Sequence, residues 1–151
     1  MRNQRSDIKL YNVLFPFWML LLFPQTWLVV LPGNFIIDSL VLIVSMFALK
    51  MFEKKRFYKR HILKIFGFGM LSDLIGAVYM FLLIWAFEVG NMGDELYITL
   101  PALFISAILI FVLNYFITFK KTDQALRLKL SLLFAIVTAP YTFLVPSAWL
   151  Y

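Results

Sequence analysis

Residues 65–87 read IFGFGMLSDLIGAVYMFLLIWAF, a continuous apolar run whose one charged residue is Asp73. The hydrocarbon core of a bilayer is about 30 Å thick, and about 20 apolar helical residues cross it. This stretch therefore predicts a membrane-spanning helix. The whole chain agrees, because 63% of its 151 residues are hydrophobic and 15% are charged, against about 45–50% and about 25% in soluble domains. A soluble globule of this length has too little interior for so many apolar side chains.

Five apolar runs of this kind divide the chain. They are separated by charged or turn-forming segments and cover residues 10–31, 35–52, 65–87, 98–119 and 130–151. Between the first two runs lie only Pro32-Gly33-Asn34, which favour tight turns, so we expect these spans to form a helical hairpin. No low-complexity linker or internal repeat interrupts the sequence. It therefore predicts an all-α bundle of five transmembrane helices that forms one domain over residues 1–151.

Basic residues are distributed unevenly around these spans. Cytoplasmic segments of membrane proteins are enriched in Lys and Arg, and the five-span arrangement places all 14 Lys and Arg residues on one side. The opposite side would carry Glu88, Asp94 and Glu95 instead. We therefore expect a cytoplasmic N-terminus and an extracytoplasmic C-terminus at Tyr151. The net charge of +6 is explained by topology, and we expect no nucleic-acid partner.

The third span contains an acid that lipid disfavours. Asp73 lies about nine residues, or roughly 13 Å, inside the predicted span and so near the midplane, where a charged residue costs about 2.5–3.5 kcal/mol. Small residues share its helix face at three- and four-residue spacings: Gly69, Ser72, Gly76 and Ala77. Such residues let a neighbouring helix approach closely, so we expect Asp73 to point into the bundle.

The fifth span supplies residues for a polar pocket around Asp73. Four of its residues lie at the same predicted depth: Thr138, Pro140, Tyr141 and Thr142. Pro140 cannot donate a backbone hydrogen bond and would leave the carbonyl of Ile136 unpaired, which a membrane protein tolerates where protein or water satisfies it. We therefore predict a mid-membrane polar pocket. The alternative is structural, with a protonated Asp73 that joins two helices by donating to a hydroxyl or a carbonyl.

Asp38 is a second candidate. It follows Asn34 by four residues and lies about 6 Å below the outer boundary of the predicted second span. Asn34 could cap the helix there, and the free N–H groups of the first turn would favour an acid. The other interpretation is a ligand or proton site, because acids within membrane spans are functional by default.

The segment before the third span interleaves basic and aromatic residues. Its basic residues include Lys54, Lys55, Arg56, Lys59 and Arg60. Anionic lipid head groups could bind them at about 1 kcal/mol per basic residue, although a topology signal explains the same residues. His61 is the only histidine and has no second ligand at helical spacing, so we expect no metal site.

The sequence contains no feature typical of an enzyme. It has no cysteine, which excludes disulfides and thiol chemistry. It also has no nucleophile elbow, no zinc-protease motif and no glycine-rich phosphate loop. We therefore expect a protein that is not an enzyme and that holds no cofactor.

Several short segments of the chain form a characteristic set: residues 35–41 (FIIDSLV), 61–64 (HILK), 69–77 (GMLSDLIGA), 138–141 (TAPY) and 149–151 (WLY). They resemble segments of a group of small five-span membrane proteins of Gram-positive bacteria. The resemblance implies a multi-pass protein of the bacterial plasma membrane and no particular chemistry. Gly69 and Asp73-Leu74 also resemble a segment of the rod-shape protein MreD, a membrane component of cell-wall elongation complexes, although the surrounding glycine spacing differs.

Two functions are compatible with these features. The first is a small transport or channel subunit that uses the mid-membrane pocket. The alternative is an accessory or scaffold subunit of a larger complex, for example in cell-envelope assembly, whose apolar faces bind another membrane protein or a second copy of the chain. Both functions require the lipid bilayer as a partner.

Overall fold

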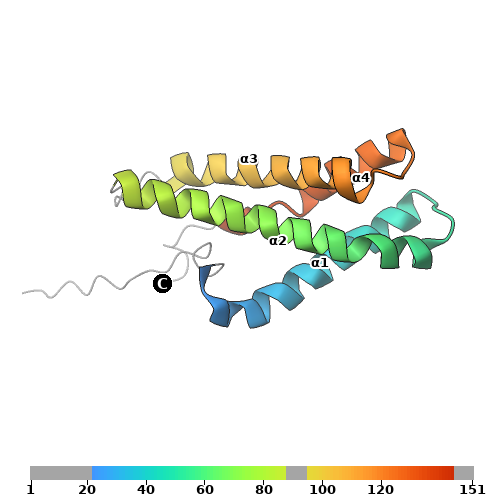
Figure 1. The fold of residues 1–151 in the computed structure, drawn as a ribbon, viewed down its shortest axis with the longest axis horizontal. Helices are drawn as coiled ribbons and strands as arrows, with labels where there is room; N and C mark the ends of the chain where they lie inside the picture. The colour runs from blue at the N-terminus through green and yellow to red at the C-terminus, as the bar shows by residue number, and fades with distance from the viewer. Residues whose placement is uncertain (1–21, 88–94, 145–151) are drawn as a thin grey trace, which may run out of the picture.

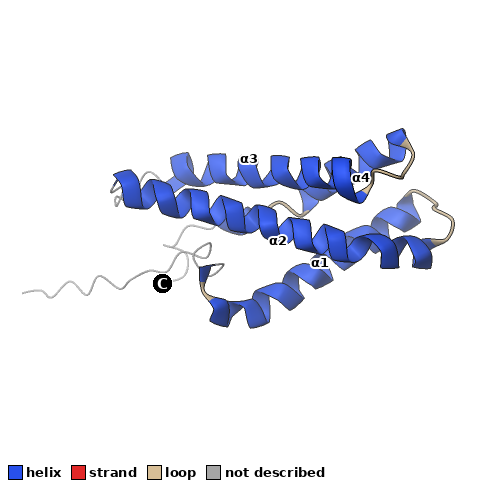
Figure 2. Cartoon of the chain, viewed as in Figure 1, coloured by secondary structure: helices blue, strands red, loops and turns tan. Residues whose placement is uncertain are grey.

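The computed structural model describes residues 22–87 and 95–144, and their regular structure is helical, without a strand (Figure 2). In chain order the elements are the 3-10 helix η2 (Pro24–Thr26), α1 (Trp27–Ala48), α2 (Lys54–Phe87), α3 (Glu95–Leu113), the π-helix η3 (Asn114–Thr118), α4 (Gln124–Val137) and the 3-10 helix η4 (Tyr141–Leu144). The predicted all-α fold is confirmed.

Four stretches of the described residues are long and apolar enough to cross a membrane. They are Pro24–Ala48, Lys54–Ala86, Leu96–Thr118 and Gln124–Leu144. Large apolar side chains on these helices point outward, among them Leu28, Val44 and Phe104, as a lipid-facing surface requires. Residues 10–21 of the predicted first span lie outside the described residues, so a fifth crossing stays a prediction.

α2 is the element around which the others are arranged (Figure 1). α3 lies along it, α1 crosses it, and α4 turns back to pack on α3. The α1–α2 turn and the turn between η3 and α4 lie at the same end of the bundle (Figure 1). Both turns and the adjoining first residues of α2 are basic: Lys50, Lys54, Lys55, Arg56, Lys120 and Lys121. The described fold therefore gathers these basic residues at one end.

The hairpin predicted at Pro32-Gly33-Asn34 is wrong. These residues lie inside α1, which begins at Trp27 and continues to Ala48. In lipid a helix satisfies its backbone groups internally, whereas a turn leaves several of them without partners. Pro32 removes one N–H donor, and the helix continues through it. The second predicted span therefore begins at Trp27 rather than at residue 35.

The basic segment 53–64, predicted to be a connection, is helical from Lys54 onward. It contains neither Pro nor Gly, and Lys, Arg and Leu are good helix formers. With 34 residues, α2 is about 51 Å long and so exceeds the roughly 30 Å of a hydrocarbon core. Lys50 and Glu53 take positive φ angles of 49° and 54°, and these left-handed residues reverse the chain between α1 and α2.

The predicted fifth span is interrupted at mid-length. α4 ends at Val137, residues 138–140 are not helical, and η4 follows. Pro140 accounts for the break, because it lacks an N–H group and its ring clashes with the carbonyl four residues earlier. Residues 145–151, with Tyr151, lie outside the described residues. The fourth span agrees with prediction to within a few residues, because α3 and η3 together cover residues 95–118 and the predicted range is 98–119.

Two clusters of buried apolar residues hold the helices together. The one nearer the basic end includes Leu42, Ile65, Ile110, Phe119 and Phe134. The other consists of Ala77, Met80, Ala102 and Phe143. Along α2, Asp73 falls between Ile65 and Ala77, and so between the two clusters. The polar part of the described interior is therefore placed midway along the central helix.

Candidate functional site

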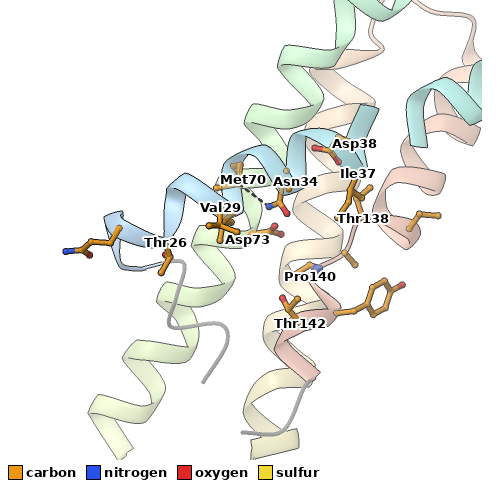
Figure 3. Close-up of a pocket in the computed structure, with 17 residues that line it drawn as sticks. Thr26, Val29, Asn34, Ile37, Asp38, Met70, Asp73, Thr138, Pro140 and Thr142 are labelled. Carbon is orange, nitrogen blue, oxygen red and sulfur yellow. Dashed lines mark hydrogen bonds between the residues drawn. The ribbon is translucent and has the colours of Figure 1, made fainter. Parts of the chain in front are cut away.

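A cavity of about 730 Å³ lies between α1, α2 and the break that follows α4 (Figure 3). Its lining is mostly apolar and comes from η2, α1, α2, the end of α4, the break and the start of η4. The polar side chains along it are Gln25, Thr26, Asn34, Asp38, Asp73, Thr138, Tyr141 and Thr142. All five residues of the predicted pocket and the secondary candidate Asp38 thus lie along one cavity.

Asp73 lies on the α2 side of the cavity and is 8% exposed, as the small residues on its helix face predict. Its Oδ1 atom is buried and has no hydrogen-bond partner among the described residues. The small-residue face divides between two neighbours. Gly69 and Asp73 line the cavity, whereas Ser72 and Gly76 pack against α3, where Ser106 Oγ donates to the carbonyl of Ser72 at 2.9 Å.

Asp38 reaches the same cavity from α1 and is 5% exposed. The predicted capping role is wrong, because α1 begins at Trp27 with Thr26 at its N-cap position, and Asp38 lies about three turns inside the helix. Asp38 Oδ2 lies 3.5 Å from the position that a Cβ on Gly69 would occupy. Since Gly69 is one turn before Asp73, the two acids lie on the facing sides of neighbouring helices.

Asn34, predicted to lie in the turn and to cap the following helix, also lines the cavity. Its Nδ2 atom donates to Met70 Sδ at 3.2 Å (Figure 3). α1 therefore presents Asn34 and Asp38, one turn apart, toward the face of α2 that carries Met70 and Asp73. Residues four apart in a helix share a face, so a helix that continues through Pro32 predicts that Asn34 and Asp38 lie side by side.

The break after α4 forms the third wall of the cavity. Thr138 Oγ1 donates to the carbonyl of Phe134 at 2.8 Å, and Tyr141 Oη donates to the carbonyl of Ile136. The carbonyl that Pro140 leaves free is thus satisfied by Tyr141. These two hydroxyls bond to the backbone of α4 in place of Asp73, and the sequence did not specify that choice of acceptor.

The basic candidates lie away from the cavity, on the first turns of α2. Lys55, Arg56, Lys59 and Arg60 are exposed, and Lys54 is half-buried. Lys54 Nζ lies 3.7 Å from the centre of the Phe47 ring, and Arg56 Nη1 lies 3.6 Å from Glu53 Oε2. Most of the basic side chains of this segment are therefore exposed at the basic end of the bundle, outside the cavity.

The chemistry of the cavity is that of a paired acid site. Its described lining holds two carboxyl groups and no Lys, Arg or His. No group of three His, Cys, Asp or Glu side chains within residues 22–87 and 95–144 could hold a metal ion. His61 lies outside the cavity lining, and its Nδ1 atom is 2.8 Å from the carbonyl oxygen of Phe57.

Comparison with known proteins adds no relative, because no family model, no curated protein and no solved structure matches the chain.

Proposed function

We propose that this chain is a small, non-enzymatic, multi-pass protein of the bacterial plasma membrane that binds and transports a small solute through the cavity at Asp38 and Asp73. Its basic end faces the cytoplasm. The observation that carries the proposal is the meeting of two buried carboxyl groups, from separate helices, at one cavity. Each acid within a membrane span is costly, and a pair on facing helices costs more because like charges repel.

The interrupted helix supports transport over simple packing. Non-helical backbone at membrane depth is tolerated where it is buried in protein or lines a water-filled cavity. Residues 138–140 are such a segment and line the acid cavity. In many transporters, substrate sites near the midplane are formed by discontinuous helices of this kind.

The purely structural explanation of the acids receives less support. Asp38 has no helix N-terminus to stabilise it, and the hydroxyls of Thr138 and Tyr141 bond to backbone carbonyls. Asp73 Oδ1 has no partner within the described residues. A residue whose function were to join two helices would be expected to make its hydrogen bonds to protein.

The test uses the absence of cysteine from the chain. A single cysteine at Thr142, on the cavity wall, is treated with a membrane-impermeant trimethylammonium methanethiosulfonate, in intact cells and in inverted vesicles. Transport requires that water reach the cavity from each side in turn, so we expect Thr142→Cys to react in both preparations. The matched control is Phe104→Cys, at a lipid-facing position of α3 that is 63% exposed, which should react in neither. Reaction of Thr142→Cys from one side only, or from neither, would contradict transport.

A further inference from the structure

The acid cavity selects for positive charge. Two carboxyl groups line it, and its described lining contains no basic side chain. In a site of low dielectric, fixed charges of one sign attract a ligand of the opposite sign more strongly than they would in water. An anionic ligand would meet the carboxyl groups without a compensating cation.

A bare metal ion is a poor match for the same residues. Hard cations such as Ca²⁺ and Mg²⁺ take six or more oxygen ligands at short distances. The described lining provides two carboxyl groups on separate helices, and the amide nitrogen of Asn34 is directed at Met70 Sδ. A group that carries its charge on a larger apolar framework needs fewer oxygen ligands.

The size and lining of the cavity fit a ligand with an apolar body. A volume of about 730 Å³ lies within the roughly 300–1,000 Å³ of pockets that hold drug-sized molecules. Val29, Ile37, Met70 and Val137 contribute apolar surface, and the thioether of methionine adapts to differently shaped ligands. Asp73 lines this space and is 8% exposed, and its buried Oδ1 atom has no hydrogen-bond partner among the described residues.

From these observations we infer that the cavity binds an organic monocation, with the acid pair Asp38 and Asp73 together supplying its counter-charge and the apolar walls around its body. The inference rests on the proposed function, because it names the ligand class of the same cavity. The charged centre lies beside the two carboxyl groups, which line the same cavity from α1 and α2.

The experiment measures binding of tetraphenylphosphonium to the purified full chain in detergent. Tetraphenylborate, an anion of nearly the same size and shape, is titrated separately. We expect the wild-type protein to bind the phosphonium and to bind the borate at least about tenfold more weakly. Asp73→Asn and Asp38→Asn should each weaken phosphonium binding by about tenfold or more, because interactions with charged groups are among the strongest that a site makes.

Asp123→Asn is the matched control. Asp123 caps α4 by accepting from the amide of Ala125, asparagine caps equally well, and the residue is not on the cavity wall. Its phosphonium affinity should equal that of the wild type. Equal affinity of the wild-type protein for both probes, or unchanged phosphonium binding in both cavity variants, overturns the inference. The charge contrast in the wild type decides the matter even if a variant fails to fold.

The two proposals can fail separately. Cysteine labelling from both sides without phosphonium binding overturns the cation class and leaves transport in place. Phosphonium binding with labelling of Thr142→Cys from one side only supports the cation site and overturns transport.

Discussion

Gly76 is the position at which α2 meets α3 and η4. A Cβ atom there would overlap Ser106 Oγ and lie 2.8 Å from Phe143 Cε2. Phe143 is almost fully buried, so its ring has little room to move. We expect Gly76→Ala to destabilise the protein by about 1–3 kcal/mol, the usual range for overpacking, as a lower midpoint of thermal unfolding in detergent. Gly67→Ala is the control, because nothing lies within 4 Å of its added methyl group. Equal unfolding midpoints for Gly76→Ala and the wild type would contradict the close packing of α2 against Ser106 and Phe143.

At the residue scale, helical spacing predicted that Asp73 is inward but not which groups it meets. Residues three and four apart share a face, yet that face is broad enough to touch two neighbours. Gly69 and Asp73 therefore line the cavity while Ser72 and Gly76 contact α3. Depth counting predicted that Thr138 and Tyr141 lie near Asp73, and they line the same cavity, but a hydroxyl has several acceptors within reach. Both donate to carbonyls of α4, the helix that precedes them.

At the element scale, Tyr141 stabilises the end of α4. Its hydroxyl donates to the carbonyl of Ile136, which Pro140 leaves without a backbone donor. We expect Tyr141→Phe to lower the free energy of unfolding by about 1 kcal/mol, because it removes this hydrogen bond and keeps the ring. The measurement is thermal unfolding in detergent. Tyr97→Phe is the control, at an exposed position of α3, and should unfold at the same temperature as the wild type. If Tyr141→Phe also unfolded at the wild-type temperature, the Tyr141 hydroxyl would not stabilise α4.

The elements that the sequence did not predict share a physical cause. Pro32-Gly33-Asn34 favours a turn by rules that hold where water can satisfy the free backbone groups, whereas α1 retains its helix through these residues. The same solvent dependence lets α2 begin in a charged segment, since a helix that leaves the hydrocarbon core can carry Lys and Arg in water. The predicted turn placed Asp38 in the first turn of a helix. Because α1 begins at Trp27, Asp38 instead lies in mid-helix and lines the cavity.

At the scale of the whole molecule, the basic residues predict an orientation. The turns at residues 49–53 and 119–123 lie at the same end (Figure 1), and Lys and Arg favour the cytoplasmic side. We expect single cysteines at Glu53 and Thr122 to resist an impermeant maleimide in intact cells and to react after permeabilisation. A cysteine at Tyr97, in the first turn of α3 at the opposite end of the bundle and 81% exposed, should react in intact cells.

This pattern separates an error of fold from an error of orientation. If α2 and α3 both cross the bilayer, residues 53 and 122 behave alike and residue 97 behaves oppositely, whichever side is cytoplasmic. If all three sites reversed, the helix arrangement would stand and the charge argument for orientation would fall. If residues 53 and 122 differed from each other, α2 and α3 could not both cross the bilayer as described. Because Asp73 lies on α2, which runs between residues 53 and 97, opposite results at those two residues are also a precondition of a mid-membrane acid site.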